Sequence, residues 1–226
     1  MLISRGGVVM AVDERVVTEA VAGLELRGNE EGLIPAFGLY LTKHFADYYN
    51  RVSYGLLGAF IRELPELEED AIALLTEAGH VCAFHTFGGI MVSVEWDAVV
   101  QPMLETREDW VKGMIGVINA LGWGRYRLRE LVPDERLVLH IEHGYEAVGV
   151  LEDYGRAKHP RCYLASGGGA GLMNLLYQGD ITQRPALTEE FFQEVFGHPR
   201  SFRARETRCL AMGDSLCEIV VERQST

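Results

Sequence analysis

Cysteine is scarce in this sequence, with four residues among 226. So few cysteines cannot form a disulfide scaffold, and a chain with 48% hydrophobic residues is long enough to bury a core without one. Long apolar runs are also missing, because no stretch approaches the roughly 18 uncharged residues of a transmembrane helix. We therefore expect no membrane span and a reducing, cytoplasmic setting.

Basic residues are few as well. The chain has 21 Lys and Arg against 33 Asp and Glu, a net charge of −12, and the positive residues are scattered. Nucleic-acid binders carry clustered positive charge, so direct contact with nucleic acid is not expected. The glycine run 167–171 lacks the dinucleotide spacing and a following Gly-Lys-Ser/Thr. We interpret that run as a site of close packing ahead of an apolar helix.

The chemistry that is present gathers near the C-terminus. Cys209 and Cys217 each stand four residues from Gly213, within strand-like sequence from Phe202 to Val221. A hairpin that turns at Gly213 would place the two thiols opposite each other on one face. From spacing alone three interpretations stay open: a metal site, two buried free thiols, or a disulfide.

The metal interpretation needs two further ligands. Glu206, three residues before Cys209, can supply an oxygen to a tetrahedral structural zinc. Residues three apart on a flat strand point to opposite faces, so Glu206 can join the thiols only through a bulge or a twisted strand. Cys162, in an irregular segment after His159 and Pro160, is the predicted fourth ligand.

The same stretch carries a family resemblance. The chain has a thiol at Cys162, followed by a run of small residues. Farther along comes the pattern Glu206-x-x-Cys209-x-x-x-Gly213-x-x-x-Cys217, which contains a carboxylate, a glycine turn and two thiols. This pattern resembles the end of the 4-vinyl reductase (4VR) domain, a family that includes sensor domains of aromatic-responsive transcription activators. It is related in fold to transport particle (TRAPP) subunits of the Golgi. The interval before Glu206 is longer than in phenol-type sensors, and 182–200 resembles an insertion.

The resemblance implies one structural zinc held by Cys162, Glu206, Cys209 and Cys217, beside a pocket for an apolar molecule. Zinc is the expected cofactor, and the expected partners are a small apolar or aromatic molecule, a second copy of the chain in a homodimer, and a separate signalling protein. The ligand is expected to contact residues from the middle of the chain, namely His80, Cys82, His85, Phe87, Trp123, Tyr145, Gly171 and Met173.

Catalysis is not expected from these residues. His80, Cys82 and His85 could form a second metal site or a Cys/His nucleophile pair, but five residues of a helix turn through about 500°, so His80 and His85 do not share a face. Structural or pocket-lining roles are expected for them instead. The alternative function is a reductase, or an accessory protein, acting on the vinyl group of a tetrapyrrole. Hydride transfer needs a cofactor, and the sequence has no dinucleotide fingerprint. A third possibility, from the related transport particle proteins, is an assembly subunit.

The hydrophobic pattern predicts an α+β fold, an antiparallel sheet with helices packed on one side and a zinc-clipped hairpin at the end of the chain. Residues 1–50 are expected to form a helical extension and 51–226 the ligand-binding domain. Helices are predicted over 13–26, 33–50, 54–64, 66–79, 107–121 and 185–195, and strands over 126–132, 137–141, 145–150 and on both sides of Gly213.

Overall fold

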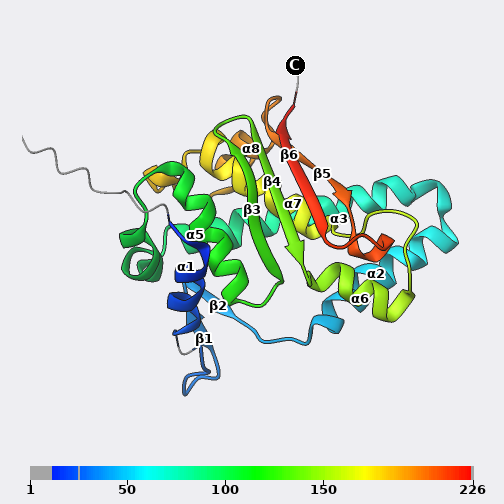
Figure 1. Ribbon diagram of the computed structural model, residues 1–226, viewed down its shortest axis with the longest axis horizontal. Coiled ribbons are helices and arrows are strands. Elements are labelled where there is room, and N and C mark those ends of the chain that lie inside the picture. The colour runs from blue at the N-terminus through cyan, green and yellow to red at the C-terminus, as the bar shows by residue number, and fades with distance from the viewer. Residues whose placement is uncertain (1–11, 25, 225–226) are drawn as a thin grey trace, which may run out of the picture.

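The computed structural model describes residues 12–24 and 26–224. Figure 1 shows a mixed fold in which helices and an antiparallel sheet pack together. The principal elements, in chain order, are α1 (Glu14–Ala22), β1 (Ile34–Ala36), β2 (Leu39–Leu41), α2 (Ala46–Glu63), α3 (Glu68–Cys82), α4 (Gly88–Met91), α5 (Arg107–Ala120), β3 (Arg125–Val132), β4 (Arg136–Glu142), α6 (Tyr145–Tyr154), α7 (Tyr163–Met173), α8 (Glu189–Phe196), β5 (Phe202–Arg208) and β6 (Cys217–Arg223).

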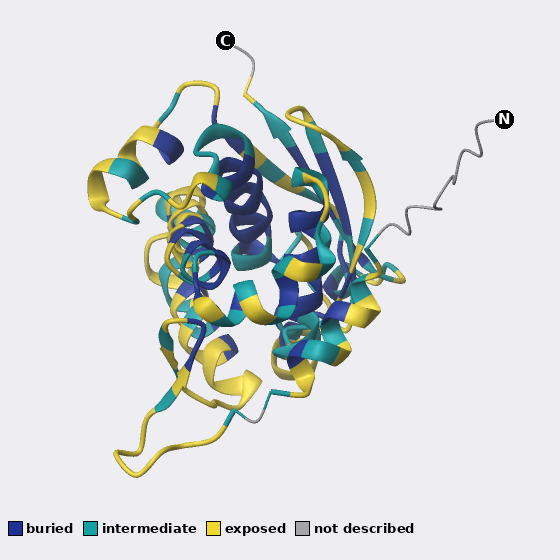
Figure 2. Cartoon of the chain, turned by 90° about the vertical axis from the view of Figure 1, so that its left-hand side faces the viewer, coloured by how far each residue is buried: buried dark blue, intermediate teal, exposed yellow. Residues whose placement is uncertain are grey.

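Four antiparallel strands form the main sheet, in the order β3-β4-β6-β5. Helices cover one side of it, as Figure 2 shows, and α7 lies against that side. A Cβ added at Gly169 of α7 would lie 3.3 Å from Val221 and 3.5 Å from Leu139. The opposite side carries polar pairs such as His140 and Glu218, whose Nε2 and Oε2 are 2.8 Å apart. The predicted α+β class and both predicted hairpins of this sheet are confirmed.

The glycine run lets two helices approach each other closely. A Cβ added at Gly79 of α3 would overlap the carbonyl oxygen of Leu164, and one added at Gly167 of α7 would overlap that of Thr76. Only glycine fits at such a crossing, because any side chain would push the two backbones apart. Close packing is confirmed, but the run lies inside α7 and not ahead of a helix.

Two helix starts follow the capping signals of the sequence. The Thr106 hydroxyl accepts the backbone N–H of Asp109 at 3.3 Å, and the Asp109 carboxylate accepts the N–H of Thr106 at 3.0 Å, which opens α5. Thr188 caps α8 by accepting the N–H of Phe191 at 3.2 Å. No helix among the described residues is long and apolar enough to cross a membrane.

Two predicted elements are wrong. Residues 33–50 do not form one helix, because β1 and β2 pair as a hairpin and α2 begins only at Ala46. Phe37 and Gly38 turn that hairpin with φ values of 54° and 67°, in the left-handed region that a right-handed helix cannot contain. Residues 145–150 begin α6 and are not a strand of the sheet.

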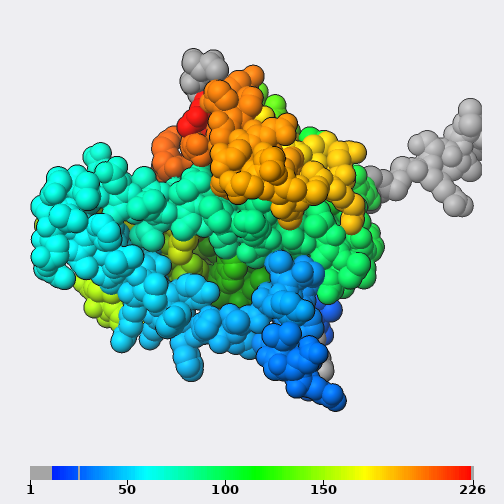
Figure 3. All heavy atoms as spheres, turned by 180° about the vertical axis from the view of Figure 1, so that it is seen from behind, coloured from blue at the N-terminus to red at the C-terminus, as the bar shows by residue number. Residues whose placement is uncertain are grey.

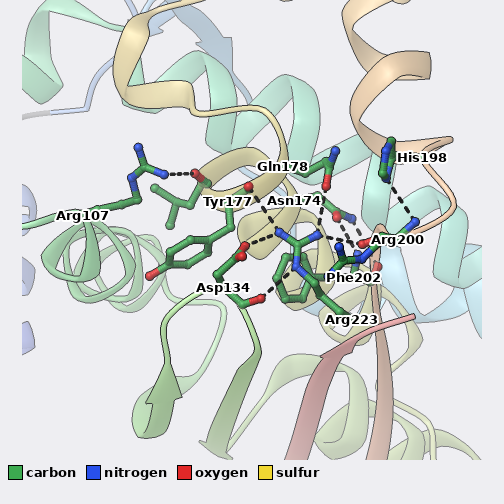
Figure 4. A network of polar contacts seen from close by, with 10 residues as sticks. Arg107, Asp134, Asn174, Tyr177, Gln178, His198, Arg200, Phe202 and Arg223 are labelled. Atoms are coloured by element: carbon green, nitrogen blue, oxygen red, sulfur yellow. Dashed lines mark hydrogen bonds and ion pairs between the residues drawn. The ribbon is translucent and has the colours of Figure 1, made fainter. Parts of the chain in front are cut away.

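Arg223 holds the C-terminal end of β6 in place (Figure 4). Its guanidinium donates to the carbonyl oxygens of Asp134 and Arg200, both at 2.8 Å, and to Oε1 of Gln178 at 2.9 Å. It also lies 4.4 Å above the ring centroid of Phe202, a cation–π contact. One side chain therefore joins β6 to the β3–β4 turn, to the segment after α7 and to the start of β5.

Candidate functional site

The structure brings the four predicted metal ligands together. Cys162 lies directly before α7, Glu206 lies on β5, Cys209 follows β5, and Cys217 opens β6. One ligand atom from each of them lies within 4.8 Å of the others. The sulfurs of Cys162 and Cys217 are 3.4 Å apart. All four cysteines of the chain are described and free of disulfide bonds.

An irregularity in the β5–β6 ladder turns Glu206 toward the thiols. Glu206 pairs with Ile219, but Arg208 pairs with Glu218, so the register shifts by one residue at Thr207. This shift is the predicted bulge. It allows Glu206, three positions before Cys209, to point to the same side of the strand as the Cys209 thiol. A tight turn follows, in which Gly213 has a φ of 97°.

The four side chains fit a tetrahedral cation. All three cysteines are buried. The Glu206 carboxylate accepts two backbone N–H groups through Oε2, from Arg161 at 2.9 Å and from Cys162 at 2.8 Å. Its Oε1 is buried and has no hydrogen-bond partner. An unpaired buried carboxylate oxygen beside three thiols fits the donor set of a structural zinc, in which four protein ligands would leave no position for a substrate.

The close approach of these four side chains shifts their pKa values. Burial raises the pKa of the Glu206 carboxyl to about 8. Hydrogen bonds from the Cys162 and Cys217 thiols lower the pKa of Cys209, and the same contact with Cys209 raises the pKa of Cys162. The carboxyl and the thiols are thus close enough that the protonation of each one changes the pKa of the others. A divalent cation at the centre would replace those protons, since thiolates and carboxylates bind metals in their ionised forms.

A cleft gives access to this cluster from solvent. It has a volume of about 350 Å³ and is lined by residues that include Thr76, His159, Tyr163, Arg205 and Glu206. Glu206 is only partly buried, in contrast to the three cysteines. Among the four residues of the cluster, Glu206 is therefore the one that this cleft reaches.

Sequence reasoning missed the polar contacts that support the cluster. Glu146 of α6 is fully buried and accepts the backbone N–H groups of Leu164 at 3.0 Å and Ala165 at 2.8 Å, at the start of α7. The Tyr54 hydroxyl of α2 contacts Glu146 at 2.7 Å and also donates to the carbonyl of Arg161. Burial raises the pKa of Glu146 to about 7 despite these donors. No local pattern signals contacts between residues so distant in sequence.

The predicted ligand-contacting residues fall into groups. The Phe87 and Trp123 ring centroids are 5.8 Å apart, and the N–H of Tyr145 donates to the Trp123 carbonyl at 3.1 Å. Cys82, at the end of α3, is exposed, its Sγ lies 3.6 Å from the hydroxyl of Thr86, and desolvation raises the pKa of its thiol. His85 is exposed and lies edge-on to its neighbour Phe84, at 5.0 Å between ring centroids.

His80, Gly171 and Met173 lie in packed interior. His80 is buried, and its Nδ1 is hydrogen-bonded to the Glu77 carboxylate oxygen Oε2 at 3.0 Å. The centroid of its ring lies 5.8 Å from that of Phe196 of α8. A Cβ at Gly171 would overlap Ala83 and lie 3.4 Å from the same Phe196 ring. Met173 is fully buried.

A recess is visible on the back of the molecule (Figure 3). Its rim is formed by the segment that leads from β2 into α2, in light blue and cyan, and by the helical segment above it, in teal. Later parts of the chain, in green and yellow-green, form its floor. The rim segment carries three exposed aromatic side chains, those of Phe45, Tyr48 and Tyr49.

Two solved structures share this architecture. The phenol-responsive sensory domain of the transcription activator PoxR, solved with phenol, has a TM-score of 0.60 and 14% sequence identity over 91% of this chain and 89% of that chain. A trafficking protein particle complex subunit 3 from Naegleria fowleri, covalently bound to palmitic acid, has a TM-score of 0.50 and 10% identity over 80% of this chain and 95% of that one. The likeness establishes the fold.

The predicted relation in fold to aromatic-sensor domains and to transport particle subunits is thereby confirmed. No protein-family model matches the sequence, and no curated protein matches it. Membership of the 4VR family accordingly stays a prediction, carried by the spacing of the thiols and the carboxylate.

Proposed function

We propose that this chain is a small-molecule-binding domain, a sensor or carrier that holds a small apolar or aromatic molecule in the recess. One zinc ion, bound by Cys162, Glu206, Cys209 and Cys217, would fasten the C-terminal hairpin to the start of α7. The observation that carries the proposal is the shared fold with a sensory domain whose structure holds phenol, together with the four converging ligands in this chain.

The recess suits such a ligand chemically. Phe87, Trp123 and Tyr145, which come from three separate segments, are the aromatic residues that we propose to contact the ligand, and the rim carries further exposed rings. Aromatic ligands gain from edge-to-face and offset contacts with aromatic side chains beyond the area that they bury. Zinc with four protein ligands has no open coordination position, so its role here is structural.

A fatty acyl chain is the second ligand class to consider, because the transport particle neighbour carries palmitic acid covalently. Cys82 offers an exposed thiol at the end of α3 and near Tyr145. Intact mass spectrometry before and after hydroxylamine, which cleaves thioesters, would detect an acyl group on this residue. Mass spectrometry of organic extracts from native protein separates the remaining classes, because a pigment carrier or reductase would release a coloured tetrapyrrole and a sensor a small aromatic molecule.

The metal is tested by elemental analysis of the purified chain. We expect about one zinc per chain, lost on replacing any of Cys162, Cys209 or Cys217 by serine, because a three-ligand remnant binds zinc far more weakly. Cys82→Ser is the matched control and should retain full zinc, since Cys82 stands apart from the four-residue cluster. Metal-free protein of undiminished thermal stability would contradict the proposal.

A further inference from the structure

We propose that Tyr54 couples the metal centre to α2, so that metal occupancy and ligand binding in the recess strengthen each other. The inference rests on the proposed function and adds to it a positioning residue, one that touches neither the cation nor the ligand. Three contacts connect the two places.

The first contact lies at the metal centre. Glu206 holds the backbone N–H groups of Arg161 and Cys162 through Oε2 and has Oε1 free of partners. A cation on Oε1 would hold the carboxylate between itself and the two N–H groups, which fixes the backbone of 161–162. Without the cation, Oε1 has no partner, so the carboxylate is held through Oε2 alone and the backbone of 161–162 is less firmly fixed.

The second contact passes from this backbone to α2. The carbonyl of Arg161 accepts the hydroxyl of Tyr54, whose ring is 6% exposed. Only three of the 18 residues of α2 are buried, namely Asn50, Tyr54 and Leu57. A helix with so few buried side chains depends on each of them for its position. Loss of order at Arg161 would therefore lower the local stability of α2.

The third contact reaches the proposed ligand site. Asn50 lies one turn before Tyr54, on the same face of α2, and its Nδ2 donates to the carbonyl of Tyr145 at 2.9 Å. Tyr145 in turn donates to the carbonyl of Trp123. The first turn of α2 also forms part of the recess rim (Figure 3). A shift of α2 would thus change both the rim and the backbone positions of Tyr145 and Trp123.

Hydrogen–deuterium exchange tests the coupling directly. Zinc-loaded and EDTA-treated protein should be compared for the wild type, for Tyr54→Phe, and for Tyr154→Phe, which makes the same chemical change at an exposed position of α6. Chelation should speed exchange of residues 46–63 by about tenfold in the wild type and in Tyr154→Phe. In Tyr54→Phe these amides should exchange rapidly in both states, although zinc stays bound.

The reciprocal effect is measured with phenol as the probe. Saturating phenol should raise the affinity for zinc, read by competition with a chromophoric chelator, by about fivefold or more in the wild type and in Tyr154→Phe. The gain should vanish in Tyr54→Phe. An unchanged zinc affinity in the wild type overturns the reciprocal half of the claim.

The failures of the two proposals can be told apart. If the wild type binds zinc and chelation changes exchange only near the hairpin and residues 155–165, the coupling is overturned and the metal site stands. If the wild type binds no zinc, the metal site and the coupling fall together. Because the wild-type arm needs no substitution, the coupling remains testable even if Tyr54→Phe does not fold.

Discussion

Glu146 is a buried carboxyl group beside the start of α7, where it accepts two backbone N–H groups and contacts the Tyr54 hydroxyl. Tyr54 has one hydroxyl proton but two acceptors, the Arg161 carbonyl and Glu146. Both contacts are satisfied together when Glu146 itself is protonated and donates to the tyrosine oxygen. Burial raises the pKa of Glu146 to about 7, which agrees with this arrangement.

Stability should consequently fall as the pH rises. A raised carboxyl pKa contributes stability in full below the unfolded value of 4.5 and loses it as pH rises through the folded value of about 7. Between pH 5 and pH 8 the wild type should lose about 2 to 3 kcal/mol of unfolding free energy relative to Glu146→Gln, which does not titrate. Urea unfolding of both proteins across this range measures the difference, and parallel pH profiles would refute it.

The difference between Glu146 and the cysteines shows what the sequence reveals at the level of residues. Cys209 and Cys217 are eight positions apart around a glycine turn, so their meeting follows from one local hairpin. Glu206 could be predicted to join the thiols only if the strand contained a bulge, and the structure contains that bulge. Glu146 meets Tyr54 across 92 positions, and no periodicity or cap encodes that contact.

At the level of elements, the crossing of α3 and α7 is the contact most sensitive to small changes. Gly79→Ala should destabilise the fold by about 3 kcal/mol, because its methyl group would overlap the backbone of Leu164. Gly168→Ala is the matched control, and Gly168 lies one turn of α7 after Leu164. Its methyl group would lie 3.7 Å from the Phe87 ring, an ordinary contact, and alanine gains about 1 kcal/mol of helix propensity. Equal stabilities of the two variants in urea would contradict this account of the crossing.

Elements with strong local signals were predicted well, and the errors share one physical cause. α5 and α8 have caps in their own sequence, Thr106 and Thr188; α5 begins at the predicted residue 107, and α8 begins at Glu189, inside the predicted range 185–195. Residues 33–50 have aromatic residues at helical spacing, but Phe37 takes a left-handed conformation that pairs β1 with β2. The hairpin lies against α4, where a Cβ at Gly89 would be 3.2 Å from Leu39, so tertiary contact decided its structure.

On the scale of the whole molecule, β6 is held at both ends. Its first residue, Cys217, belongs to the metal cluster, and its last, Arg223, donates to three separate segments. Between them the strand is paired on both sides, with β4 and with β5. The two ends stand about 20 Å apart, at roughly 3.3 Å per residue, and share no partner.

Independent attachment at the two ends predicts additive losses of stability. Arg223→Lys should cost about 2 kcal/mol, because an ammonium group cannot reproduce the planar set of donors to Asp134, Gln178 and Arg200. Zinc content should not change. Chelation of the variant should then lower the unfolding free energy by the same amount as chelation of the wild type, within about 0.5 kcal/mol. A larger discrepancy in this cycle would mean that β6 detaches as one unit, and the two attachments would have to be treated as a single cooperative contact.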